Sequence, residues 1–151
     1  MMKMLTTDRE TGHQTLVLGL SDGNVELLCR DQPILFDLAE VVPGQTARVA
    51  VLYFHGDGVD DRRRAGLAAG LADADRHDGT RAVRHVAVLS LDARALTDLL
   101  RPRTATRLSS PIPGWGGDVA IICAKTERDF LEEFSSQFDA DTVVRTDPRI
   151  L

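Results

Sequence analysis

Aromatic side chains are scarce in this chain of 151 residues: they make up 5% of it, with one Trp and one Tyr. The core must therefore be built mainly from Leu, Val, Ile and Ala, in line with an apolar fraction of 43%. No apolar run approaches the roughly 20 residues that a membrane-spanning helix needs. Residues 1–14 mix charged residues with Thr and lack the apolar stretch of a secretory signal, so we interpret them as a flexible N-terminal lead-in.

Cysteine and lysine are also sparse. Cys29 and Cys123 are the two cysteines, and neither has a second Cys or His at metal-ligand spacing. We expect two buried, free thiols in a reducing cytoplasm, and no cofactor. The net charge of -5 argues against unaided binding to nucleic acid or to an anionic membrane. A composition rich in Arg, Asp and Ala is typical of bacterial proteins from GC-rich genomes.

Apolar patterning predicts six strands, a short seventh edge strand and four helices in a single domain over residues 15–151. The strands are predicted at 15–20, 34–38, 48–54, 83–91, 104–108, 118–125 and 142–145. Helical spacing predicts two longer helices at 59–74 and 128–138 and two short helices at 22–30 and 92–100. The fold class is therefore α/β or α+β with a mixed β-sheet.

The same order of elements occurs twice along the chain. Residues 15–78 and 83–146 each contain strand, short helix, strand, strand and helix, close to a ferredoxin-like β-α-β-β-α unit. At an offset of 71 residues, Leu28 aligns with Leu99. Two interpretations fit: a duplicated unit, whose halves often build one site at their junction, and two successive stretches of a single α/β fold.

The strand at 48–54 ends in a suggestive motif, Tyr53-Phe-His-Gly-Asp-Gly58. It resembles the His-Gly-Gly-Gly oxyanion loop of lipases and esterases in the α/β-hydrolase family, where backbone N–H groups stabilise a tetrahedral intermediate. Asp57 replaces the third residue of that motif, and the partner motif G-x-S-x-G occurs nowhere in the chain. The resemblance therefore implies no catalytic serine, and a glycine-rich strand-to-helix turn is the alternative.

A ligand or metal site is a second interpretation of the same strand end. His55, Asp57, Asp60 and Asp61 offer an imidazole and carboxylates, which suit Zn, Mn or Mg. In a small enzyme with this site, His55 would be the general base or a metal ligand. The alternative is an acidic helix start that complements the helix dipole.

A loop rich in Pro and Gly contains Trp115 and is a candidate for binding a partner, because an aromatic side chain on a turn is a typical interface anchor. Unlike charges flank the strands at 34–38 and 104–108, namely Asp31, Asp37 and Glu40 against Arg101, Arg103 and Arg107. Such edges suit head-to-tail docking or an anionic partner. The predicted partner-binding residues are Trp115, Ile112, Arg103 and Arg107.

These observations predict a non-enzymatic binding or assembly module of the cytoplasm, which binds a protein partner or itself as a homodimer. The alternative is a small enzyme or a ligand or metal binder at His55-Gly-Asp-Gly58. A nucleic-acid adaptor that uses the segment from Arg101 to Arg107 is a third hypothesis, and its affinity would fall steeply with salt. Membrane binding is not expected.

Overall fold

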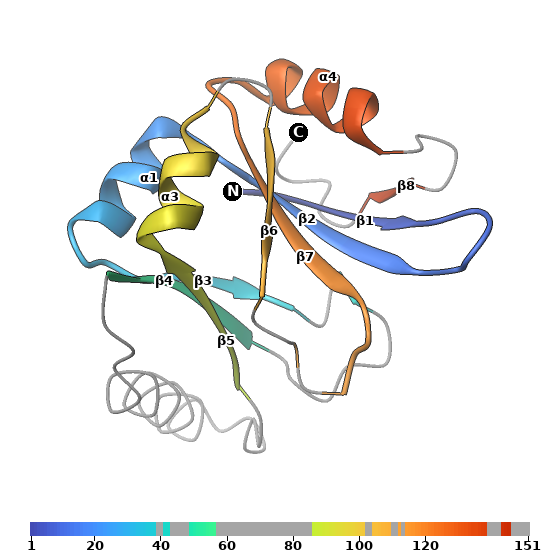
Figure 1. Ribbon diagram of the computed structural model, residues 1–151, viewed down its shortest axis with the longest axis horizontal. Coiled ribbons are helices and arrows are strands. Elements are labelled where there is room, and N and C mark those ends of the chain that lie inside the picture. The colour runs from blue at the N-terminus through green and yellow to red at the C-terminus, as the bar shows by residue number, and fades with distance from the viewer. Residues whose placement is uncertain are drawn as a thin grey trace.

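A computed structural model describes residues 1–38, 41–42, 49–56, 86–101, 104–109, 112, 114–138 and 143–145, with the backbone alone at 55, 56, 86 and 143–145. These residues form two mixed β-sheets and three helices, which confirms the α/β class (Figure 1). The predicted helix at 59–74 lies outside the described residues. Within the described part, no helix is long and apolar enough to cross a bilayer.

The larger sheet has five strands in the order β6-β7-β2-β1-β8. β1 and β2 form an antiparallel hairpin, β2 and β7 are parallel, and β6 and β8 pair antiparallel at the two edges. The strands are β1 (Met2–Thr7), β2 (Gln14–Leu20), β6 (Ala105–Leu108), β7 (Asp118–Cys123) and β8 (Val143–Arg145). The short edge strand predicted at 142–145 is therefore confirmed as β8.

The smaller sheet has the order β3-β4-β5. β3 (Ile34–Asp37) is antiparallel to β4 (Val49–Gly56), and β4 is parallel to β5 (Val86–Asp92). Residues 50–53 of the central strand β4 are all buried, as its continuous apolar run predicts. Among the described strands, β3 has a neighbour on one side only, and the same is true of β6 in the larger sheet.

The three helices each begin after a residue whose side chain caps the first turn. These pairs are Ser21 with α1 (Asp22–Cys29), Asp92 with α3 (Ala93–Leu99), and Thr126 with α4 (Glu127–Gln137). Each capping oxygen accepts the backbone N–H three residues ahead, a donor that has no partner inside the helix. The caps explain why helices as short as α1 and α3 begin directly after strands.

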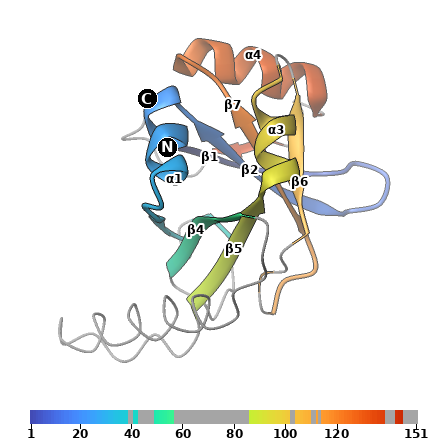
Figure 2. The same cartoon turned by 60° about the vertical axis from the view of Figure 1, so that its left-hand side comes forward.

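The main core fills the space between the two sheets, and Figure 2 shows β4 and β5 on the opposite side of it from β1, β2 and β7. Every second residue of four strands is buried there, because side chains alternate across a sheet. These residues are Leu16, Leu18, Leu20, Ala50, Leu52, Ala87, Leu89, Leu91, Val119 and Ile121. The core is thus aliphatic, as the scarcity of aromatic residues predicts.

A second, smaller core lies on the outer face of the larger sheet, beneath α4 (Figures 1 and 2). Phe130 and Phe134 of α4 are buried against Met4, Val17 and Ile122 of the sheet. Gly19 of β2 permits this contact, since a Cβ at that position would come within 2.5 Å of the Phe130 ring. Three of the seven aromatic residues of the chain therefore lie at this helix or at its C-cap, Phe138.

The expected flexible lead-in is wrong for residues 2–7, which form β1 and pair with β2 in continuous register. Leu5 is buried in the main core and Met4 in the core beneath α4, which is the two-residue alternation of a strand. The hairpin turn is held by Asp8, whose Oδ1 accepts the N–H groups of Glu10 and Thr11. Gly12 completes it at a φ of 71°, a region that favours glycine.

The prediction that each half forms a ferredoxin-like unit of its own is also wrong. In that unit the first strand would pair within its own half, but β2 pairs with β7 and β4 pairs with β5. The pairing therefore crosses between the predicted repeats 15–78 and 83–146. Hairpins β3-β4 and β6-β7 each accept a parallel strand from the other half, which joins the two halves through one shared core.

Candidate functional site

Strands β3 and β6 occupy equivalent positions in the two sheets. Leu35 of β3 pairs with Val51, whose other neighbour is Val88 of β5. Arg107 of β6 pairs with Ala120, whose other neighbour is Val17 of β2. Val17 of β2 and Val88 of β5 are 71 residues apart, as are Leu28 and Leu99, so we treat β2 and β5 as equivalent strands. In that comparison, Leu35 and Arg107 occupy the same position in their sheets. The chain thus has two related strand edges, each preceded by a short helix.

The β6 edge borders a groove of about 560 Å³ between α3 and β6. α3 runs beside β6 in both views (Figures 1 and 2). The groove is lined by Asp92, Arg94, Ala95, Asp98, Arg101, Thr104, Ala105, Thr106 and Arg107. Four consecutive residues at β6 contribute to it, although neighbouring residues of a strand point to opposite faces. The groove therefore follows the edge of the strand rather than one face of the sheet.

Three Arg and two Asp side chains line this groove, so its charge is positive by one. Arg94 is exposed, and no ion pair joins it to another residue in the part of the chain that the structure describes. Arg101 approaches Asp98 at 3.8 Å between Nη1 and Oδ1, a loose contact of two exposed side chains. Thr106 is 6% exposed, and its hydroxyl has no hydrogen-bond partner among the described residues. The groove offers guanidinium donors to an acidic or carbonyl-bearing ligand.

Arg107 is held at the boundary between this groove and a second, polar hollow of about 540 Å³. Its Nη1 donates to Asp118 Oδ2 at 3.2 Å, and His13 Nε2 lies 3.0 Å from the same oxygen. Its guanidinium carbon lies 6.0 Å from the centre of the Phe138 ring. These contacts fix the direction of Arg107, while 59% of its side chain remains exposed.

The polar hollow lies on the outer face of the larger sheet, where α4 ends. Threonine hydroxyls and the cluster around Asp118 line it, namely Thr6, Thr7, Asp8, Thr11, His13, Thr15, Arg107, Asp118, Gln137 and Phe138. The backbone N–H groups of Thr11 and Glu10 hold the pKa of Asp8 below its ordinary value. Since both carboxylates already accept hydrogen bonds, the hollow does not present a free acid-base pair.

The β3 edge differs from the β6 edge in both charge and polarity. Residues 22–37 carry four carboxylates and one Arg, whereas residues 92–107 carry two carboxylates and four Arg. Leu35 of β3 is 51% exposed and Leu27 of α1 is 46% exposed. In the other half, Arg107 and Asp98 occupy the corresponding positions. One edge is therefore acidic with two exposed leucines, and the related edge is basic with one, Leu100, which follows α3.

Two of the predicted partner-binding residues pack in or against the main core. Ile112 is 1% exposed in the main core, so its expected contact with a partner is wrong for this conformation. Trp115 is half-buried and packs against the same core, and its Nε1 donates to Gln14 Oε1 at 3.2 Å. Gly117 lets the indole lie flat, since a Cβ there would meet the ring at 2.2 Å. The loop uses its aromatic side chain mainly to cover the strand ends.

The other predicted site residues have different outcomes. Arg107 is exposed at the β6 edge, as expected, and its role in binding stays a prediction. Arg103 and the acidic residues Asp57, Asp60 and Asp61 lie outside the described residues, as does the side chain of His55. Among the described side chains, no three His, Cys, Asp or Glu residues are placed to hold one metal ion. The ligand site at the end of β4 is therefore untested.

Both cysteines are free, as predicted, but they are not both buried. Cys29 at the end of α1 is exposed, and Cys123 at the end of β7 is half-buried. Burial, together with the nearby Asp22 carboxylate, raises the pKa of the Cys123 thiol. A raised pKa disfavours the thiolate, which is the nucleophilic form, at Cys123.

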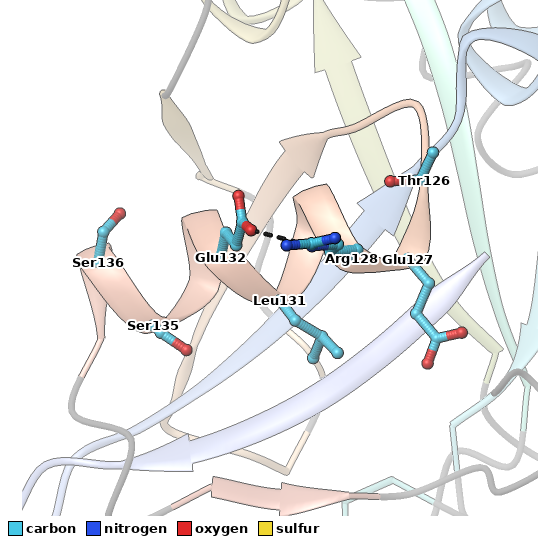
Figure 3. A pocket seen from close by; sticks show the side chains of 7 residues that line it. All are labelled: Thr126, Glu127, Arg128, Leu131, Glu132, Ser135 and Ser136. Atoms are coloured by element: carbon cyan, nitrogen blue, oxygen red, sulfur yellow. Dashed lines mark hydrogen bonds and ion pairs between the residues drawn. The ribbon is translucent and has the colours of Figure 1, made fainter.

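A shallow hollow on the outer side of α4 completes the surface features (Figure 3). Arg128 and Glu132 lie along one side of the helix and form an i,i+4 pair with a Nε–Oε1 distance of 3.3 Å. Leu131 points away from this pair, on the side of the helix that also carries Glu127 and Ser135. An exposed pair of this kind is worth little energetically, and the hollow shows no chemistry that selects a ligand.

No family model, curated protein or solved structure matches this chain. The two strand edges are therefore interpreted from their own geometry.

Proposed function

We propose that the protein is a non-enzymatic binding module that accepts an extended polypeptide segment along the free edge of β6. One observation carries this proposal: the groove between α3 and β6 follows a strand edge that has no neighbour among the described strands. A peptide can add to such an edge as a further strand, with main-chain hydrogen bonds for affinity and side-chain contacts for specificity. The helix beside the edge provides the second wall of the groove.

The charge of the groove favours a segment that carries Asp or Glu. Arg94, Arg101 and Arg107 line it from α3, from the end of that helix and from β6. Exposed charges of this kind act mainly on association rate and specificity, and their effect is screened by salt. Arg107 is directed by Asp118 and Phe138, so part of the entropy cost of ordering it is already met before binding.

The same proposal gives a reason for the repeated order of elements. Two halves with the same strand pairing would each provide a helix-bordered edge, and sequence divergence would leave one basic and one acidic. The parallel pairing that β2-β7 and β4-β5 share is consistent with the hypothesis of a duplicated unit, which stays a prediction.

The test is selection of peptides from a random octapeptide library by the immobilised full chain. We expect enriched peptides to alternate apolar residues with Asp or Glu, because alternate side chains of an added strand face the groove. Arg94→Glu should lose these peptides, since it reverses a charge that has no ion-pair partner among the described residues. Arg128→Glu, on the outer side of α4, is the matched control and should retain them. Equal retention by the two variants, or no peptide retained by the natural sequence, would refute the proposal.

A further inference from the structure

We infer that the segment bound along β6 is the β3 edge of a second copy of this chain, so that copies associate head to tail. This inference rests on the proposed function, because it names the partner of the same groove. Its basis is that the two edges differ in the ways that make them complementary. The experiment below separates failure of the partner assignment from failure of the groove itself.

Charge is the first complementary feature. Asp31 precedes β3, Asp37 is the last residue of that strand, and Glu26 is one helical turn before the end of α1. Arg94, Arg101 and Arg107 line the groove at β6. Each of the two edges also carries charges of the opposite sign, since Arg30 pairs with Glu26 and Arg101 approaches Asp98. The surplus is nevertheless negative at one edge and positive at the other, which disfavours pairing of two identical edges and favours the unlike pair.

Exposed apolar side chains are the second feature. Three large hydrophobic side chains of the described surface are exposed. Leu27 and Leu35 lie on the helix and the strand of the acidic edge, and Leu100 follows α3 in the other half. Soluble proteins usually protect edge strands with charge, as Arg107 does at β6. At the position that corresponds to Arg107, β3 has Leu35, and the charge of the strand lies at its last residue, Asp37. An apolar side chain on an edge strand is expected where another strand covers it.

Geometry sets the consequence of such a contact. An interface between two different patches of the same chain is heterologous, so each copy retains one free edge of each kind until a ring closes. A pair of variants, each with one edge blocked, therefore has a distinctive behaviour. Each variant alone cannot associate, but a mixture of the two forms one contact and stops at a 1:1 dimer.

The experiment uses two double variants of the full chain. Leu27→Arg with Leu35→Arg blocks the acidic edge by adding positive charge at exposed positions. Arg94→Glu with Arg101→Glu blocks the basic edge, again at exposed positions. Circular dichroism and thermal melting of each variant check that the fold is retained. Native mass spectrometry and sedimentation equilibrium then give the mass of the natural sequence, of each variant and of their equimolar mixture.

We expect the natural sequence to associate, each variant alone to associate at least tenfold more weakly, and the mixture to form a dimer of one copy of each. A variant with a blocked acidic edge that still self-associates as strongly as the natural sequence would overturn the inference. A natural sequence that stays monomeric at all concentrations, yet selects peptides that Arg94→Glu loses, would refute the second copy as partner and leave the groove supported. If the natural sequence neither selects peptides nor associates, both the groove and the second copy as its partner are refuted.

Discussion

The β3 edge and the β6 edge have the same strand pairing but different surfaces. In both, a short capped helix leads into a four-residue edge strand, which pairs antiparallel with a buried central strand. The buried residues correspond: Phe36 and Leu108 both face the main core, as do Leu28 and Leu99. The exposed residues do not correspond in character, since Leu27 and Leu35 in one half are matched by Asp98 and Arg107 in the other.

This difference between the two edges shows which positions of the sequence are free to vary. Core positions must fill a space of fixed shape, so replacement there is limited to apolar residues of similar volume. Exposed positions on an edge have little effect on folding, and they determine which partner the edge accepts. Two edges built on one scaffold can therefore become unlike in charge while the sheets beneath them stay alike.

The largest expected effect concerns Gly19, at a position where the two sheets differ for a packing reason. Its counterpart in β5, 71 residues later, is Ser90, whereas Gly19 lies against the ring of Phe130. Gly19→Ala should destabilise the fold by roughly 1–3 kcal/mol, because the added methyl group overpacks the core beneath α4. Denaturant unfolding measures the loss. Gly116→Ala is the control, since a Cβ there meets nothing within 4 Å.

An outcome in which both glycine variants lose the same stability would show that β-strand propensity or loop entropy, and not contact with Phe130, explains the effect. The comparison of the two sheets would then lose its packing explanation at this position.

Replacing Arg107 with Leu gives β6 the residue that β3 has at the corresponding position, and its expected effect is smaller. The ion pair with Asp118 is exposed, so the free energy of unfolding should fall by less than about 1 kcal/mol. Association and peptide binding should weaken about threefold to tenfold, because one of three basic groups in the groove is removed rather than reversed. Isothermal titration with a selected peptide measures the change, and Arg128→Leu is the matched control. A large stability loss with unchanged binding would assign Arg107 to the sheet instead of to the groove.

Much of this fold was predictable from local pattern, and the site was predictable only in part. α1, α3 and α4 follow from their caps and helical spacing, and the central strands follow from continuous apolar runs. β1 was missed because Lys3 and the charged turn after Thr7 resemble a solvent-exposed lead-in. No alternation of polar and apolar residues marks this strand, since Lys3 and Leu5 share one face and Met4 and Thr6 share the other, so local pattern carries little signal for it.

Partner choice between strands could not be predicted, since pairing of β2 with β7 joins residues about a hundred positions apart and no local pattern encodes it. Ile112 and Trp115 were assigned to the surface because Pro and Gly surround them. In a chain with so few aromatic residues, the core recruits the large side chains of that loop. The unlike charges beside β3 and β6 are visible in the sequence, but the groove beside β6 needs the structure.

The last prediction concerns the two thiols and tests whether Cys29 and Cys123 differ in exposure to solvent as the structure describes. Cys29 is exposed, whereas Cys123 is half-buried and its pKa is raised by desolvation and by Asp22. Because the thiolate is the reacting species, Cys29 should react with iodoacetamide about tenfold faster than Cys123 near neutral pH. The difference between the two reaction rates should narrow as the pH rises toward the pKa of Cys123, since a raised pKa delays formation of its thiolate.

Cys29 corresponds to Leu100, which does not line the groove. The reaction rate of Cys29 should therefore stay the same when the protein concentration is raised and copies associate. Mass spectrometry of timed samples gives both rates, and protection of Cys29 at high concentration would place the contact between copies on a different side of α1 from the one that Leu27 occupies.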